Sequence, residues 1–357
     1  MLIHQSLADW SRWQRRRQGP GRALRAQLAG GKRAPSPVVM APVVMAPAGT
    51  TGGSGRPVVV ALDGLSPSQL ASLVRPAELL VARSVPVVAV CATDPGESLA
   101  ALGVALAGPL ATPDRAGWSA LGLAPPRAVL GAGGYMRVGR AGWELAAAFG
   151  APYLAAQHGI LTPHAPPLDS GVHLLAWSEA DARFWTSGRA DVATSVVGSQ
   201  GLWAASRSPV APEPGAPLCF LGQLHGIELT RATTRRTVSA LREEVPTFVY
   251  RPHPGERDRR SRRQHRAWRR QGVAFADADG PLLAMRSPVA AIFSTGILEA
   301  AAAGLPAFGV CTRPPPWIRE LWDRYGIERW GGSGTTRVDL PAAEPAAVIA
   351  DAVEALS

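Results

Sequence analysis

Cysteine is scarce in this chain of 357 residues: three thiols, Cys91, Cys219 and Cys311, stand far apart, and no two have CxxC spacing. Zinc ribbons need cysteines at short spacing, and disulfide-stabilised secreted domains need many of them. The sequence therefore excludes a zinc ribbon, and its scattered thiols indicate a reducing compartment.

Long apolar runs are missing as well. A helix that spans a bilayer needs roughly 18–20 consecutive apolar residues, and no stretch of the sequence reaches that length. Residues 1–10 also lack the ordering of a secretory signal, because the arginines follow the apolar residues instead of preceding them. We therefore expect a cytoplasmic protein.

Apolar residues make up 46% of the chain and charged residues 18%, which supplies a sizeable core and excludes a disordered chain. The length is enough for two domains. The net charge of +10 is concentrated, because residues 1–50 and 251–270 each carry net +7 and the remainder carries net −4. Such patches indicate localised anionic partners, or arginine faces that are only solvated.

Residues 1–56 look like a basic leader followed by a flexible linker. Trp10 and Trp13 stand among arginines, a mixture that can lie on an anionic bilayer surface. Residues 34–56 are rich in Pro, Gly, Ser and Thr and hold a near-duplication, PVVMAP, at 37–42 and 42–47. We expect peripheral contact of this leader with the inner membrane face, or a segment without function.

From residue 57 onward, short apolar runs alternate with helical patterns, and the proline-rich stretch 209–217 separates two such series. The first series predicts strands at 57–63, 85–91, 127–131, 152–157, 173–177 and 193–198, and helices from 67, near 97–107 and at 142–149. The second predicts strands at 218–222, 247–250, 272–276, 289–293 and 306–310, and helices at 229–244, 256–271, 296–303, 315–325 and 343–356. This alternation is typical of parallel sheets. We predict an α/β protein with two Rossmann-like doubly wound domains, 57–212 and 213–357, facing each other across a ligand cleft.

One predicted strand, within Thr247–Pro254, ends abruptly in Arg251-Pro252-His253-Pro254. The prolines stop the strand and stiffen the turn after it. Ligands bind at the carboxyl ends of strands in open α/β sheets. There Arg251 by its charge and His253 through an N–H group would hold phosphate oxygens, although a capped turn is the alternative.

A second strand end carries Ser294-Thr295-Gly296, which opens a helix with Glu299 in it. Hydroxyls and free backbone N–H groups at a helix start form an anion site. Glu299 would bind ribose hydroxyls, or it would be the third helical residue of an N-terminal cap.

In the first series, Gln157-His158-Gly159 follows a predicted strand, and His164 stands between prolines. His158 would act as general base toward an acceptor hydroxyl, because the pKa of histidine lies near working pH. The alternative is a histidine that only hydrogen-bonds. Gln157, Gly159 and His164 are predicted on the acceptor side.

A metal is not expected. Asp277-Ala278-Asp279 resembles a metal-binding DxD, but Gly280-Pro281 follows, and capping of a helix is favoured. Asp63 after the first strand is a further candidate base or a helix cap. No other cofactor is expected.

These motifs resemble GT-B transferases that use cytidine nucleotides, namely the CDP-glycerol glycerophosphotransferases of teichoic acid synthesis and the capsule polysialyl- and Kdo-transferases. The resemblance covers roughly residues 150–310 at the level of motifs. It implies that His253-Pro254 and Ser294-Thr295 bind the phosphate and nucleotide of a CDP- or CMP-linked donor, and that His158-Gly159 carries the base. The comparable element of the capsule enzymes is acidic, whereas here it is Gln157-His158.

The resulting hypothesis is a metal-independent glycosyl- or polyol-phosphate transferase of cell-surface polymer synthesis. Residues 57–212 would bind an anionic or lipid-linked polymer acceptor, and residues 213–357 the donor. One alternative is an enzyme like the UDP-N-acetylglucosamine 2-epimerases, which the Gly-helix-Glu arrangement also resembles. Another is a nucleic-acid-binding protein that uses residues 257–270, where Trp268 is the single aromatic platform; no specific nucleic acid is expected.

Overall fold

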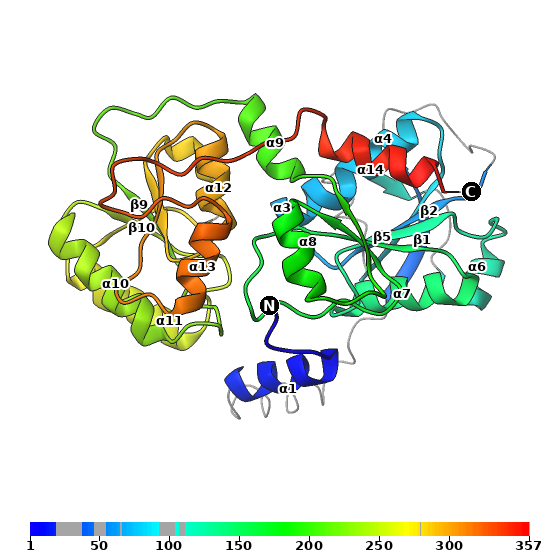
Figure 1. Cartoon of the computed structure of the whole chain (residues 1–357), viewed down its shortest axis with the longest axis horizontal. Coiled ribbons are helices and arrows are strands. Elements are labelled where there is room, and N and C mark those ends of the chain that lie inside the picture. Colours follow the sequence, from blue (N-terminus) through cyan, green and yellow to red (C-terminus); the bar gives the residue numbers. More distant parts are fainter. Residues whose placement is uncertain are drawn as a thin grey trace. The chain divides into compact units, whose positions relative to one another are not determined.

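The computed structural model describes residues 1–18, 38–45, 55–64, 66–92, 104–106, 111–278 and 280–356. It divides into two compact units (Figure 1). Unit 1 comprises Met1–Gly201 together with Pro341–Ser357, and unit 2 comprises Leu202–Leu340.

Unit 1 is built on an eight-stranded sheet of order β4-β1-β3-β2-β5-β6-β7-β8. The strands β3, β2, β5, β6, β7 and β8 are mutually parallel, while β1 runs antiparallel to both of its neighbours. Their bounds are β1 Val38–Met45, β2 Val58–Leu62, β3 Val87–Ala92, β4 Val104–Leu106, β5 Ala128–Gly131, β6 Tyr153–Ala156, β7 His173–Ala176 and β8 Ala193–Val196.

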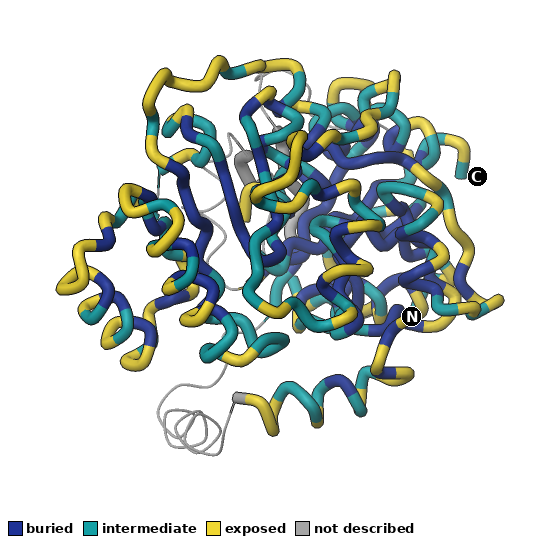
Figure 2. Tube along the Cα trace, turned by 60° about the vertical axis from the view of Figure 1, so that its left-hand side comes forward, coloured by how far each residue is buried: buried dark blue, intermediate teal, exposed yellow. Residues whose placement is uncertain are grey.

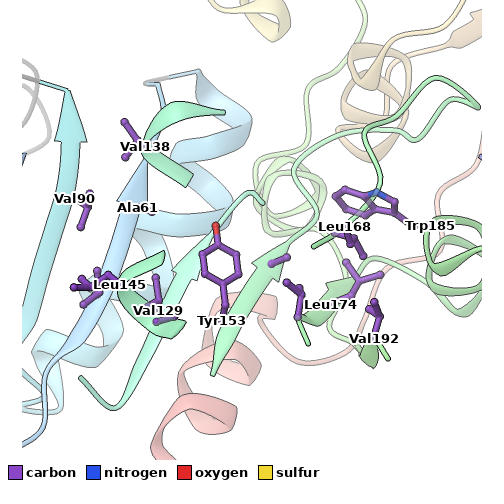
Figure 3. Packing of buried hydrophobic residues seen from close by; sticks show 14 of the residues in the cluster. Ala61, Val90, Val129, Val138, Leu145, Tyr153, Leu168, Leu174, Trp185 and Val192 are labelled. Carbon is purple, nitrogen blue, oxygen red and sulfur yellow. The ribbon is translucent and has the colours of Figure 1, made fainter. Parts of the chain in front are cut away.

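Helices cover both faces of this sheet, because successive residues of β2 point to opposite sides. Val58 and Val60 face a core formed with η1, α4 and α14, whereas Val59 and Ala61 face a core formed with α6, α7 and α8. Figure 3 shows this second core. The helical segments of unit 1 are α1 Leu7–Gln18, α3 Pro67–Gln69, the π-helical η1 Leu70–Val74, α4 Arg75–Ala82, α6 Arg115–Ala120, α7 Arg137–Phe149, α8 Glu179–Thr186 and α14 Pro345–Glu354.

Unit 2 contains a five-stranded, fully parallel sheet of order β11-β10-β9-β12-β13. The strands are β9 Cys219–Leu221, β10 Val249–Arg251, β11 Ala274–Phe275, β12 Val289–Ala291 and β13 Ala307–Gly309. The helices are α10 Arg231–Glu244, α11 Arg259–Arg270, the 3-10 helix η2 Leu282–Met285, α12 Thr295–Ala302 and α13 Pro316–Arg324, and α9 Gln200–Arg207 contains the division between the units. The strands β9 and β12 are buried throughout, and Figure 2 shows how buried and exposed segments alternate along the chain.

The predicted fold class is confirmed: both units are α/β with the Rossmann-like winding, and the sheet is fully parallel in unit 2 and parallel from β3 to β8 in unit 1. Each strand predicted from residue 57 onward is present, because runs of valine, leucine and alanine between turn residues suit a strand buried on both faces. The cleft between the two domains stays a prediction.

Two predictions in the first half were wrong. Part of the predicted linker, Val38–Met45, is strand β1 and pairs with β3. Pro42 lies opposite Val88 of β3 and outside the three residues that pair with β4. Of the helix expected near 97–107, residues 104–106 form strand β4 instead, and the rest lies outside the described residues.

The predicted second domain also ends too late. Residues 341–357 belong to unit 1, where α14 buries Ile349 and Val353 against the sheet face that α4 covers. Arg75 and Arg83 of α4 pair with Glu344, Asp351 and Glu354. An amphipathic pattern predicts a helix and its buried face, but it does not predict which sheet the helix packs against.

Candidate functional site

In unit 2 the predicted donor residues gather at the carboxyl edge of the sheet. In chain order its strands read 3-2-1-4-5, so the winding reverses between β9 and β12. Ligands of open α/β sheets bind outside such a reversal, at the carboxyl ends of the strands. The segments that leave β9, β10 and β12 here begin at Gly222, Pro252 and Ile292.

His253 is exposed at this edge and held in one tautomer. Its Nδ1 accepts a hydrogen bond from the backbone N–H of Gly255 at 3.0 Å, so in the neutral ring the proton sits on Nε2. Burial of part of the ring lowers the pKa of His253, an effect that the Glu256 charge opposes. A neutral ring with an N–H at Nε2 is a hydrogen-bond donor suited to a phosphate oxygen.

The ring of His253 stacks on His225, which sequence reasoning missed. The two ring centroids lie 3.7 Å apart and the planes differ by 11°. Burial, together with the charges of His253 and Arg231, lowers the pKa of His225 to about 4, an effect that the Glu256 charge opposes. His225 follows β9 by a few residues, so the strand-end rule that selected His253 would have found it too.

A buried carboxylate supports the loops that carry both histidines. Glu256 is 4% exposed and accepts hydrogen bonds from the Tyr250 hydroxyl, from His265 Nε2 at 2.7 Å and from the backbone N–H of Leu224 at 2.8 Å. It therefore ties the loop after β10 to the loop after β9.

The loop after β9 is also tied to the residue that precedes the α12 cap. The Gln223 side-chain amide accepts from the Phe293 N–H at 3.0 Å and donates to the Phe293 carbonyl. This two-way contact joins the ends of β9 and β12, and with the Glu256 contact it holds three strand ends together around the reversal of the sheet.

Ser294 is the N-cap of α12, with its Oγ accepting from the Gly296 N–H at 3.2 Å. The capping alternative for Ser294 is therefore realised, and Thr295 is the first helical residue. Gly296 allows close packing: a Cβ there would lie 2.6 Å from a methyl carbon of Leu221. The helix start thus sits directly over the end of β9.

Arg251 and Glu299 lie beneath this edge. Arg251 donates to the carbonyls of Gly280 and Ala278, so part of its guanidinium fixes that loop. Glu299 is the fifth helical residue, and the predicted capping role at the third position is wrong. Burial raises the pKa of Glu299, an effect that the Arg251 charge opposes. Pro254 is exposed next to His253.

In unit 1 the corresponding reversal lies between β2 and β5. There Asp63, the candidate base or cap, accepts from the backbone N–H groups of Val138 and Gly139 at 2.9 Å each. It caps α7, a helix that comes much later in the chain than the one expected. Burial raises the pKa of Asp63. The positive end of α7 already holds a carboxylate, so it offers no phosphate site.

A glycine-rich turn after β5, which the sequence reading did not single out, completes this edge. The Gly134 N–H donates to Asp169 at 3.0 Å, and Arg140 pairs with the same carboxylate at 2.7 Å. The Gly133 N–H donates to the Tyr153 hydroxyl, whose ring is labelled in Figure 3. Gly139 leaves no room for a Cβ, which would lie 2.1 Å from the Gly133 carbonyl oxygen.

His158 lies at the end of β6 with Nε2 3.4 Å from the Tyr135 hydroxyl. Burial lowers the pKa of His158, and the Ala156 backbone opposes this effect. Burial also raises the pKa of Tyr135, with the Asp63 charge adding to the shift. At neutral pH the pair is therefore an unprotonated imidazole beside a protonated phenol.

Gln157 and Gly159 form hydrogen bonds within the protein. The Gln157 amide donates to Asp181 at 2.9 Å and to the Gly159 carbonyl at 3.1 Å, and it accepts from the Trp177 N–H at 2.9 Å. Gln157 is 2% exposed. These hydrogen bonds position the loop that carries His158, and the predicted place of Gln157 on the acceptor side stays a prediction.

His164 is covered by the amino-terminal helix. Trp13 stacks on its ring at 4.7 Å with planes 6° apart, and Trp10 Nε1 donates to its carbonyl at 2.9 Å. Burial lowers the pKa of His164 to about 4, with the charges of His4 and Arg17 adding to the shift. The prediction of a separate leader is wrong for residues 1–18, which pack on unit 1, and residues 19–37 lie outside the described part of the chain.

The arginine-rich segment is helix α11, whose inward face is Ser261, His265 and Trp268. Its arginines are exposed, and beside it an open pocket of about 690 Å³ is lined in part by Arg235, Arg236 and Arg313. Trp268 is 3% exposed, so the single aromatic expected to stack nucleobases is unavailable.

Within the described residues, no group of three His, Cys, Asp or Glu side chains could hold a metal ion, and Asp279 of the DxD lies outside them. No described helix is long and apolar enough to cross a membrane.

No protein-family model and no curated protein matches this chain. Among solved structures, Phytolacca americana UGT2 in complex with UDP-2fluoro-glucose and pterostilbene is similar, with a TM-score of 0.38 and 13% identity over 82% of this chain and 89% of that chain. This likeness is too distant to support an argument, so the assignment of the fold rests on the strand order of each sheet.

Proposed function

We propose that this protein is a metal-independent, nucleotide-dependent transferase in which unit 2 binds an activated donor and unit 1 activates an acceptor hydroxyl. The observation that carries the proposal is the gathering of His225, His253 and the α12 start at the sheet reversal of unit 2. Imidazole N–H groups and a helix start are suited to a diphosphate and would stabilise the charge of a leaving nucleotide.

The half-buried carboxylate of Glu299 supports a nucleotide rather than a simple phosphate. It lies beyond the first turn of α12, in a helix whose amino end faces the proposed phosphates, and no described side chain is hydrogen-bonded to it. Ribose hydroxyls would supply the missing donors. We infer a CDP- or CMP-linked donor from the resemblance of the motifs.

His158 is proposed as the general base. Its ring is unprotonated at neutral pH, and its Nε2 is hydrogen-bonded to the Tyr135 hydroxyl. When an acceptor hydroxyl replaces that contact, Nε2 takes its proton as the oxygen attacks the donor. Transfer then releases the nucleotide, whose negative charge the unit 2 residues hold.

The acceptor is proposed to be an anionic or lipid-linked polymer, such as a teichoic acid or capsule chain, and the exposed arginines of α11 support an anionic one. The epimerase alternative needs carboxylates in unit 1, but Asp63 and Asp169 are already engaged with α7 and Arg140. The exposed arginines of α11 are compatible with the nucleic-acid alternative, but Trp268 is buried and cannot stack on bases.

The direct test is a titration of CDP, UDP, CMP and a random oligonucleotide against wild-type protein and His253→Ala. We expect saturable binding of a cytidine nucleotide that His253→Ala abolishes without loss of folding. Oligonucleotide binding with a steep salt slope and no nucleotide preference would support the nucleic-acid alternative instead.

A further inference from the structure

The stacked rings of His225 and His253 are the most unusual contact at the proposed donor site. Their centroids lie 3.7 Å apart with an interplanar angle of 11°. The two residues come from loops after different strands, β9 and β10, which Glu256 holds together through the Leu224 N–H. The stack therefore lies at the carboxyl edge of the unit 2 sheet, between the loops that leave two of its neighbouring strands.

A glycine makes this stack possible. A Cβ on Gly255 would lie 3.1 Å from His253 Nδ1 and 3.3 Å from two ring carbons of His225. The Gly255 N–H also fixes the tautomer of His253. Backbone and side chains together therefore present two imidazole edges at one place on the carboxyl edge of the sheet.

The charges around the pair determine how many protons it holds. The charges of His253 and of Arg231 on α10 disfavour the protonated form of His225, while the Glu256 charge favours protonation of both rings. The Glu256 charge is shared with the Tyr250 hydroxyl and His265, which both point at its carboxylate. Two parallel rings at this separation cannot both carry a positive charge without strong repulsion, and in the absence of an anion both are neutral near pH 7.

We infer that His225 and His253 form a single receptor for the donor's phosphate groups and take up one proton between them when those phosphates bind. This inference rests on the proposed function. A bound phosphate charge stabilises one imidazolium, and the second ring stays neutral and donates an N–H. His225 is thereby assigned as a second donor-binding residue.

The consequence is a pH-dependent affinity with a definite sign. Anion binding raises the pKa of the pair, so the complex binds more protons than the free protein between the free and bound values. Donor affinity should therefore rise as pH falls from 8 toward 5.5, by at most tenfold per pH unit for one proton.

The experiment is calorimetric titration of CDP, UDP and inorganic pyrophosphate at pH 6.5 in two buffers, Pipes and ACES, that differ in ionisation enthalpy. The difference in heat gives the number of protons taken up, and we expect a value between zero and one. His225→Phe keeps a stacked ring without nitrogen, and it should lose the uptake and bind roughly tenfold more weakly. His225→Gln is the second variant in case the phenyl ring impairs folding, which circular dichroism checks, and His173→Phe in unit 1 is the matched control.

The outcomes separate the two proposals. Nucleotide binding without proton uptake, or with uptake that persists in both His225 variants, would overturn the receptor and leave the transferase proposal standing. Pyrophosphate binding with proton uptake but no nucleotide preference would support the receptor and contradict the nucleotide donor. Absence of binding by all three ligands would overturn both.

Discussion

The hydroxyl of Tyr135 lies 3.4 Å from Nε2 of His158. The Tyr135 ring in turn meets Trp10 edge-on, with the ring centroids 5.8 Å apart. Three segments far apart in the sequence thus meet at the proposed base: helix α1, the glycine-rich turn after β5 and the loop after β6. Turnover should therefore depend on α1 staying packed on unit 1, although no residue of α1 was expected near this site.

The first prediction concerns His158→Asn. Donor affinity should survive because the proposed donor residues belong to unit 2, while turnover should fall by roughly two to four decades, the usual contribution of a general base. Because burial lowers the pKa of His158, wild-type turnover should stay flat from pH 8 through 6.5 and decline only below that value. Single-turnover kinetics across this range provide the measurement.

Tyr135→Phe is the matched control for this prediction. It retains the ring that Trp10 contacts and removes only the hydroxyl, so a smaller loss with a shifted acid limb is expected. A collapse of donor affinity in His158→Asn, with normal turnover of bound donor, would instead make His158 a binding residue.

The second prediction concerns Trp10→Ala. Trp10 is 8% exposed and donates to the His164 carbonyl, so its truncation should lower the free energy of unfolding of unit 1 by about 3–5 kcal/mol. Arg16→Ala changes an exposed residue of the same helix and should stay within about 0.5 kcal/mol. Urea unfolding compares the two. Equal stability of both variants would show that α1 is not part of the folded unit.

The sheets could be predicted because each strand carries its own signal. Val58, Val59 and Val60 are buried toward one face or the other, and a run of this kind between turns indicates a strand whatever surrounds it. The strand-end rule also selected His253 and His158 correctly as edge residues. Applied to every strand end, the same rule would also have found His225, which follows β9 by a few residues.

The predictions that were wrong concern contacts between distant parts of the chain. Trp10 and Trp13 among arginines fit a bilayer surface or a protein surface equally well, and His164 supplies the latter. Asp63 was a candidate base or a cap of the next helix, but its carboxylate reaches α7, some seventy-five residues on. A local pattern identifies a group that needs a partner; the fold selects which partner it receives.

The third prediction follows from the buried imidazole of His164. Its pKa is about 4 in the folded protein and about 6.5 in an unfolded chain. Between these values the unfolded chain binds more protons, so the free energy of unfolding should decrease as pH falls from 6.5 toward 4. Above pH 6.5 this group contributes no slope.

His164→Phe tests that slope, because a phenyl ring keeps the stack on Trp13 and cannot be protonated. Thermal unfolding measured from pH 7.5 to 4.5 should show a shallower acid loss in this variant than in the wild type. Identical slopes would assign the acid sensitivity to other groups, such as the half-buried His225, and a steeper slope would contradict the predicted sign.

The last prediction concerns contact with an anionic membrane, which the sequence had suggested through the tryptophans of α1. Trp10 is buried in unit 1, so such contact would be electrostatic and would use the exposed Arg15, Arg16 and Arg17. A juxtamembrane arginine contributes about 1 kcal/mol, so replacing all three by glutamine should weaken binding to anionic vesicles by roughly two decades.

The matched control replaces Arg259, Arg262 and Arg263 of α11. Sedimentation at low and high salt distinguishes the helices, because a Debye length of about 10 Å at 0.1 M salt screens either contact. Loss of vesicle binding in the α11 variant alone would show that the arginines of unit 2 make the anionic contact, and we would then assign those arginines to the proposed polymer acceptor.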